Sequence, residues 1–112
     1  MKIQHYKDVQ PQLVMGGNIE KRVLIGSADK APNFTMRLFT LKPGASTPYH
    51  THEWEHEIFV VEGKIKVRSK DGEQMIEAGG FVFVEPNEEH QFVNVNEGPS
   101  SFICVVPNYG EK

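Results

Sequence analysis

Turn-forming residues interrupt this chain at such short intervals that long helices have no room. Glycine, proline, asparagine and aspartate separate short runs that are apolar or alternate between apolar and polar side chains. No segment of ten or more residues shows a convincing helical period. We predict strands at residues 22–25, 34–41, 56–61, 64–68, 73–76, 81–84, 90–95 and 101–106. Many short strands separated by such turns indicate an all-β fold, an antiparallel sandwich or barrel.

Two of these strands carry specific expectations. Residues 81–84 are wholly apolar, so we expect this strand to be buried on both faces. The strand at 34–41 has Arg37 among apolar neighbours. A cation there could bind an anionic substrate or pair with an acid, but we expect it to face outward into solvent.

Length and charge narrow the class of protein. The 112 residues fit one domain, residues 1–112, and the composition of 38% hydrophobic and 24% charged residues is that of an ordinary globular chain. The net charge of −3 and the scattered basic residues give no reason to expect nucleic-acid binding.

No apolar run approaches the roughly 20 residues of a membrane helix, and the N-terminus lacks an apolar secretory segment. With Cys104 as its single cysteine the chain cannot form an internal disulfide, so we expect a cytoplasmic location.

The histidines fall in a pattern that a metal ion would explain. His50, His52 and His56 lie within seven residues, and His90 follows later, after a Glu-Pro-Asn-Glu-Glu segment. Imidazole is the commonest protein ligand for transition metals. A His-x-His pair on an extended segment points both rings to the same face, because side chains alternate along a strand. Whether the His56 ring points to this same face depends on whether the residues between His52 and His56 form a turn.

These residues resemble the two motifs of the cupin superfamily. The stretch Gly44-x5-His50-x-His52-x3-His56-x6-Gly63 is similar to the first motif, with histidine in place of the usual glutamate. The stretch Gly79-x5-Glu85-x-Asn87-x2-His90-x3-Asn94 is similar to the second, with Glu85 and Asn87 at its proline and glycine positions. Asn87 is the residue best able to replace glycine at a positive φ angle, so a tight turn can survive.

The resemblance implies a fold and a ligand set. The fold would be a cupin-type jelly-roll β-barrel, an antiparallel double-stranded β-helix, with an N-terminal arm at about 1–25 and the conserved barrel at about 34–106. The metal ligands would be His50, His52, His56 and His90, near one mouth of the barrel. The chain looks like the small bacterial single-domain cupins that bind manganese through four histidines. Manganese(II) is therefore the expected cofactor, with iron(II), nickel(II), copper(II) and zinc(II) as alternatives.

Other residues are candidates for the wall of a pocket. Trp54 lies between ligands and could wall the pocket or belong to a subunit interface. Cys104 could approach the metal, although a buried cysteine acting as a small apolar residue is the simpler interpretation. The full set of candidate pocket residues is Arg37, Phe39, Trp54, Phe92, Phe102 and Cys104.

Three functions remain open from the sequence. The leading hypothesis is a metal-dependent enzyme with oxygenase-type chemistry, whose ion holds a small organic substrate and dioxygen. An ion bound only by neutral imidazoles keeps its positive charge, which favours an anionic substrate. The alternatives are a non-enzymatic barrel that binds metal and a small ligand, and a metal-dependent isomerase or lyase. The resemblance also implies a homodimer.

Overall fold

Strands make up nearly all the regular structure of this chain. The computed structural model describes residues 1–111. Its strands are β1 Gln12–Val14, β2 Ile19–Ile25, β3 Phe34–Leu41, β4 His56–Glu62, β5 Lys64–Ser69, β6 Gly72–Glu77, β7 Phe81–Val84, β8 Gln91–Asn94 and β9 Ser100–Pro107. Four short 3-10 turns accompany them: η1 Tyr6–Asp8, η2 Met15–Gly17, η3 Ser27–Asp29 and η4 Asn108–Glu111. Within the described residues, no helix is long and apolar enough to cross a membrane.

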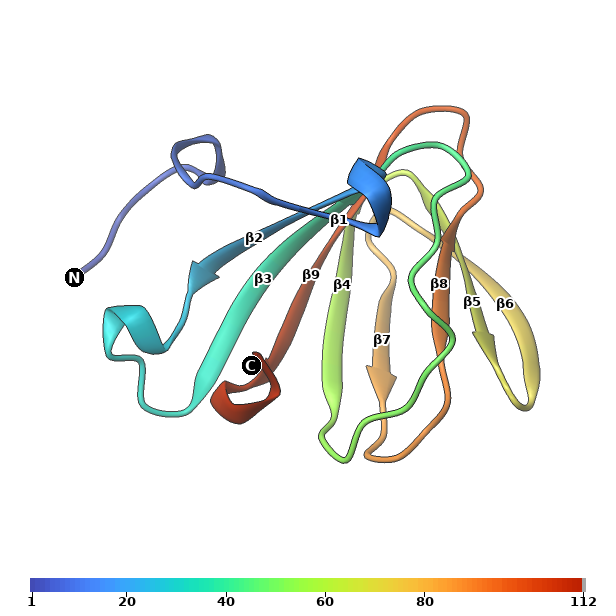
Figure 1. Ribbon diagram of the computed structural model, residues 1–112. Helices are drawn as coiled ribbons and strands as arrows, with labels where there is room; N and C mark the ends of the chain where they lie inside the picture. Colours follow the sequence, from blue (N-terminus) through green and yellow to red (C-terminus); the bar gives the residue numbers. More distant parts are fainter. Residues whose placement is uncertain (112) are drawn as a thin grey trace.

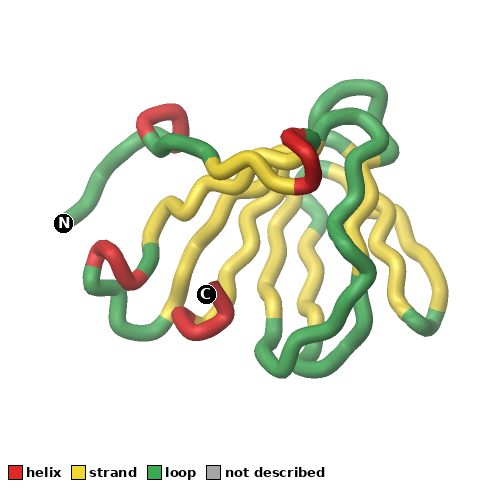
Figure 2. Tube along the Cα trace, viewed as in Figure 1, coloured by secondary structure: helices red, strands yellow, loops and turns green. Residues whose placement is uncertain are grey.

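The strands form two antiparallel sheets that face each other (Figures 1 and 2). One sheet has the order β1-β2-β3-β9-β4-β7, and the other has the order β6-β5-β8. The pairing of β3 with β9 and of β9 with β4 brings together segments that are far apart in the sequence. The architecture confirms the all-β jelly-roll fold expected from the sequence.

The expected burial of β7 on both faces is wrong. Phe81 is 79% exposed and Phe83 is 58% exposed, whereas Val84 is buried. The reason is topological, since β7 is the edge strand of the six-stranded sheet and only its inner face meets the opposing sheet. The outward phenylalanines continue an apolar surface with Phe59 of β4, which pairs with Phe81 in the register.

Side-chain alternation on the inner strands fills the core and also positions the functional residues. On β4, His56, Ile58 and Val60 are buried while the residues between them are exposed. On β9, Phe102 and Cys104 are buried in the same alternating way. A histidine placed in an inward position of β4 therefore enters the barrel interior as a direct result of strand geometry.

Backbone hydrogen bonds fasten the two histidine segments to each other. His50 and His90 form an isolated antiparallel bridge, in which each amide donates to the carbonyl of the other, at 3.1 and 3.0 Å. The amide of Asn87 donates to the carbonyl of His52 at 2.6 Å. Asn87 has a φ of 69°, so the expected substitution of asparagine for glycine in a left-handed turn is confirmed. The loop before β4 is thereby held against the chain that enters β8.

A buried asparagine anchors the other end of β8. Asn94 donates from Nδ2 to the carbonyls of Leu41 and Gly98, at 2.9 and 3.1 Å. Its Oδ1 accepts hydrogen bonds from the hydroxyl of Ser100 and the amide of Asn96, at 2.7 and 2.9 Å. All four polar positions of the amide are thus used, which is what a side chain that is 2% exposed requires.

Candidate metal centre and its pocket

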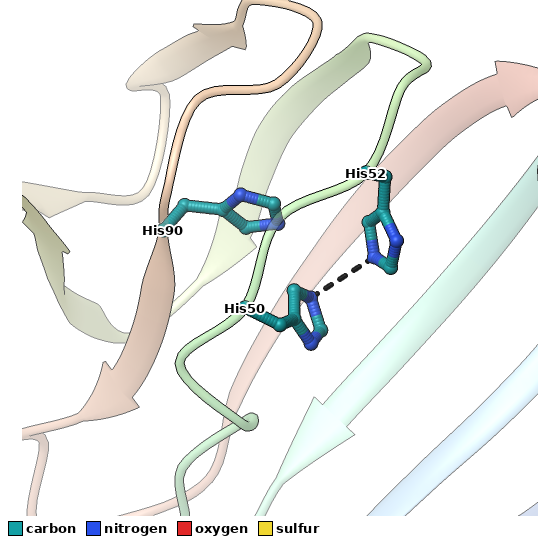
Figure 3. Close-up of side chains that lie close together, drawn as sticks. All are labelled: His50, His52 and His90. Atoms are coloured by element: carbon teal, nitrogen blue, oxygen red, sulfur yellow. Dashed lines mark hydrogen bonds between the residues drawn. The ribbon is translucent and has the colours of Figure 1, made fainter.

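Three histidine side chains converge on one point. Each of His50, His52 and His90 offers a ring nitrogen that lies within 4.8 Å of the corresponding nitrogens of the other two. Figure 3 shows the rings of His50 and His52 rising from the loop before β4, with the ring of His90 directed toward them from the facing segment. The Nε2 atoms of His50 and His52 are 3.1 Å apart. Three ring nitrogens that converge within this distance form a site that a single divalent ion can occupy.

The fourth histidine lies against this group. The ring centroid of His56 is 4.9 Å from that of His90 and 5.3 Å from that of His52. His56 is 6% exposed, and its Nε2 has no hydrogen-bond partner among the described residues. A buried imidazole nitrogen without a partner costs free energy, and a bound metal would satisfy it. Ligation by His56 remains a prediction, since its ring does not belong to the tight group of three.

Hydrogen bonds at Nδ1 influence whether the Nε2 atom of a histidine ring is unprotonated and available to a metal. Nδ1 of His90 lies 2.8 Å from the carbonyl oxygen of Glu88, so Nδ1–H donates there and Nε2 is left unprotonated. Nδ1 of His56 lies 3.3 Å from Sγ of Cys104, and with Nδ1–H donating to sulfur its Nε2 is likewise free. The Glu88 carbonyl thus holds the His90 ring in the tautomer that presents Nε2 to a metal, and the contact with sulfur is compatible with the same tautomer of His56.

The surroundings favour the neutral rings of His50, His52 and His56. Burial, reinforced by repulsion from the other imidazoles and from Arg37, lowers the pKa of His56 to about 3. Burial and the neighbouring imidazoles lower the pKa of His50 to about 4, and burial also lowers the pKa of His52. Because a metal binds the neutral ring, these directions favour ligation at neutral pH.

A cavity of about 300 Å³ opens onto the four histidines. Its walls are mainly apolar side chains, Val14, Met15, Ile19, Phe39, Phe92 and Phe102. The lining residues also include Thr47, Lys21, Arg37 and Cys104, and among the described residues no carboxylate lines the cavity. The cavity therefore suits a small, largely apolar ligand, and its ionisable walls can supply only positive charge.

The outward orientation expected for Arg37 is wrong. Arg37 is 8% exposed and lines the cavity. The reason is its register: Arg37 pairs with Cys104, and both occupy inward positions of their strands. The Arg37 Nη2 donates to Cys104 Sγ at 2.9 Å, and its guanidinium lies 5.0 Å from the ring centre of Phe39. Burial raises the pKa of the Cys104 thiol, which stays protonated beside the guanidinium.

Trp54 packs against His52 and does not line the cavity. Its ring stacks on His52 with centroids 4.5 Å apart and an interplanar angle of 8°. Tyr109 of η4 also contacts the Trp54 ring, perpendicular to it and with centroids 5.8 Å apart. Gly110 fits closely here, because an added Cβ would lie 2.8 Å from Trp54 Nε1. The remaining expected pocket residues, Phe39, Phe92 and Phe102, all line the cavity.

Two charged residues of this region were not singled out from the sequence. Lys21 of β2 lines the cavity, and Glu111 of η4 pairs with both Lys21 and Arg37. Lys21 shares its face with Phe39, its partner in the register, but that pairing cannot be read from the sequence alone. Glu111 lies beyond the last predicted strand, where no pattern gives its position.

Comparisons with known proteins agree with this geometry. A family model described as "Cupin domain" matches residues 37–106. Among curated proteins, the sequence search finds no match. Many solved structures are similar, including that of the polyketide cyclase RemF from Streptomyces resistomycificus. It is 35% identical over 96% of this chain and 79% of that chain, with a TM-score of 0.88.

Two more distant structures show the same fold. A predicted oxalate decarboxylase from Thermotoga maritima is 22% identical over 96% of this chain and 99% of that chain, with a TM-score of 0.84. A sugar phosphate isomerase from Silicibacter pomeroyi is 19% identical over 95% of this chain and 75% of that chain, with a TM-score of 0.82. At these identities the likeness concerns architecture, and many activities share one architecture.

Proposed function

Because the chain belongs to the cupin domain family, we propose that it is a metal-dependent enzyme with oxygenase-type chemistry on a small organic substrate. One observation carries the proposal. The buried Nε2 of His56 has no hydrogen-bond partner among residues 1–111, it lies beside three converging imidazoles, and this cluster opens onto an apolar cavity. A purely structural histidine cluster would have its buried nitrogens satisfied by the protein.

The residues present fit a divalent transition metal. His50, His52 and His90 would hold it, and His56 would complete the set. Among the described residues of the cavity wall there is no carboxylate to neutralise the ion. A divalent ion bound by imidazoles alone keeps its positive charge, and would supply Lewis-acid chemistry and, for manganese or iron, redox chemistry. We propose manganese(II) from the similarity to four-histidine cupins, with iron(II) as the alternative.

The protein's own residues would bind the substrate, orient the histidine rings and exclude water from the cavity. The apolar wall around Phe92 and Phe102 would surround the body of the substrate and remove it from solvent. Trp54 would hold the His52 ring by stacking, and Cys104 and the Glu88 carbonyl would orient the rings of His56 and His90. In the part of the chain that the structure describes, the cavity wall offers no carboxylate base, which favours metal-centred chemistry over a reaction that needs a positioned side-chain base.

A second candidate is a Lewis-acid reaction without dioxygen. The observation that favours it is the similarity to a polyketide cyclase, at 35% identity over 96% of the chain. For such a reaction the bound metal would supply Lewis-acid chemistry, and the apolar cavity walls would favour a folded conformation of the substrate. An isomerase or lyase belongs to the same class.

Oxygen uptake separates these candidates. The protein is loaded in turn with manganese, iron, nickel, copper and zinc, and is incubated with small phenols, diketones and thiols while dissolved oxygen is recorded. We expect oxygen uptake with manganese or iron, and its loss in His52→Ala. Product formed equally well without oxygen would support the Lewis-acid candidate. Absence of turnover with every metal and substrate would contradict the enzyme proposal. A co-purified small ligand identified by mass spectrometry would then favour a binding barrel.

A further inference from the structure

Arg37 has an N–H group that forms no hydrogen bond with the described residues. Its side chain is 9% exposed, and its Nε has no partner among the described residues. Nη1 donates to Oε1 of Glu111 at 3.2 Å, and Nη2 donates to Cys104 Sγ at 2.9 Å. A thiol is a weak acceptor for a guanidinium, and a buried unpaired N–H is costly. This cation in the cavity wall is therefore incompletely satisfied and points to an anionic ligand.

A second cation lies beside it and shares the same carboxylate. Lys21 lines the cavity, and its ammonium group pairs with the other oxygen of Glu111. The side chains of Lys21 and Glu111 are each 19% exposed, so this ion pair is largely shielded from solvent. Two cations thus face one carboxylate, which leaves a net positive charge beside a cavity that no acidic residue lines within the described part of the chain. These two cations hold the carboxylate of Glu111 and can hold the carboxylate of a ligand in its place.

The carboxylate that bridges the two cations comes from a separate segment. Glu111 is the last residue of η4, which appears as the red coil near the C label in Figure 1. The start of η4 is fixed by Asn108, which donates from Nδ2 to the Ala31 carbonyl at 2.6 Å and accepts from the Thr35 hydroxyl at 2.8 Å. Beyond Asn108 the segment is held by the edge-on contact of Tyr109 with Trp54 and by the Glu111 ion pairs.

We propose that Lys21 and Arg37 form the anchor for the carboxylate of the substrate, and that Glu111 occupies this anchor when substrate is absent. The arriving carboxylate displaces that of Glu111 and gains the free Nε of Arg37, because a guanidinium binds carboxylates through two parallel N–H groups. This inference rests on the proposed function and gives its substrate class, which is a small organic acid with an aromatic or apolar body.

The anchor lies close enough to the histidines to direct a substrate to them. The Cys104 sulfur contacts Arg37 Nη2 at 2.9 Å and His56 Nδ1 at 3.3 Å, so one side chain separates the anchor from the cluster. Phe39 stacks under the guanidinium, and Phe102 stacks on Phe39 with centroids 5.3 Å apart. An aromatic or aliphatic body bound to the anchor would pack on these rings within the cavity of about 300 Å³.

The test measures binding, not turnover. Phenylacetate and its neutral amide, phenylacetamide, are titrated calorimetrically into the metal-free protein and into the zinc-loaded protein. If Glu111 occupies the anchor nine-tenths of the time, Glu111→Gln should tighten phenylacetate binding about tenfold, because the competent fraction rises from a tenth to one. Phenylacetamide binding should not change. Arg37→Met and Lys21→Met should each weaken phenylacetate binding in the Glu111→Gln background.

A matched control exists on the other sheet. Glu73 also bridges a lysine and an arginine, Lys66 at 3.7 Å and Arg68 at 3.0 Å. Glu73→Gln removes an equivalent carboxylate away from the cavity and should leave phenylacetate binding as in the wild type. Thermal unfolding is recorded for every variant. If Arg37→Met does not fold, the comparison of phenylacetate with phenylacetamide in Glu111→Gln still tests whether Glu111 competes with the ligand carboxylate.

Two results would overturn the inference: phenylacetate affinity that Glu111→Gln leaves unchanged, or an equal gain for the amide. Undetectable phenylacetate binding by Glu111→Gln would also overturn it. Elemental analysis of the same preparations keeps the two proposals apart. A protein that binds no metal but binds phenylacetate through Arg37 would contradict only the proposed function. A protein that binds metal but not phenylacetate would contradict only the inference.

Discussion

Acid should destabilise the metal-free protein through its buried histidines. The pKa of His56 is about 3 in the folded protein and that of His50 is about 4, whereas imidazole in an unfolded chain has a pKa of about 6.5. The unfolded state therefore binds protons first as the pH falls. The stability that depends on neutral rings is fully present above about pH 6.5, and it is lost progressively as the pH falls toward the folded pKa values.

The size of the effect follows from the same values. At pH 5 the linkage for His56, which is 6% exposed, amounts to about 2 kcal/mol of lost unfolding free energy. His50 is only partly buried, so after allowance for solvent screening we assign it about 1 kcal/mol. The free energy of unfolding of the metal-free protein should thus fall by about 3 kcal/mol between pH 7.5 and pH 5.

Urea denaturation followed by circular dichroism, with a chelator present, measures this change. His56→Asn removes the titrating ring and should lower the pH-dependent loss to about 1 kcal/mol. His5→Asn alters an exposed histidine that lies outside both sequence motifs, so it controls for the loss of a histidine as such. If His56→Asn retains the full loss of stability between these pH values, the assignment of the effect to His56 is refuted.

The remaining predictions concern the metal, the core and the assembly. His90→Ala should lower the content of bound divalent metal at least tenfold by elemental analysis, and unchanged content would refute the site. Asn94→Leu should cost about 2–4 kcal/mol in urea denaturation because buried partners lose their hydrogen bonds. Gly63→Ala should cost about 2–5 kcal/mol, since Gly63 has a φ of 87° and its Cβ would lie 2.0 Å from Ser100 Oγ. A homodimer remains our prediction, which light scattering after size-exclusion chromatography tests; a monomer at high concentration would contradict it.

Most of the fold could be predicted from the sequence because local residue patterns determine where the strands and turns lie. The strands at 34–41 and 81–84 coincide with β3 and β7, and others differ by a few residues at their ends. The strand ahead of them is longer than expected, because β2 begins at Ile19, where apolar and charged residues alternate only weakly. The turn at Asn87 was predictable because few residue types accept a positive φ.

What the sequence could not supply was the position of one strand relative to another. Arg37 reads as an exposed charge on its own strand, and only its register with Cys104 places it inside the barrel. The same limit applies to β7, whose apolar residues do not reveal that it is an edge strand with an uncovered outer face. Glu111 and Lys21 meet through tertiary contacts alone. Such contacts between strands leave no periodic trace in a single sequence.

The position of Trp54, stacked on His52 and in perpendicular contact with Tyr109, gives the molecule an internal optical reporter. Trp54 is the single tryptophan of the chain, so its emission comes from one place. Its stacked ring touches a proposed ligand on one face, and its edge meets the segment that carries Glu111. A paramagnetic ion bound at the histidines should quench this fluorescence, and movement of η4 should shift its wavelength. Occupancy of the histidine cluster and displacement of the segment could then be followed in solution, at the same time, without any added label.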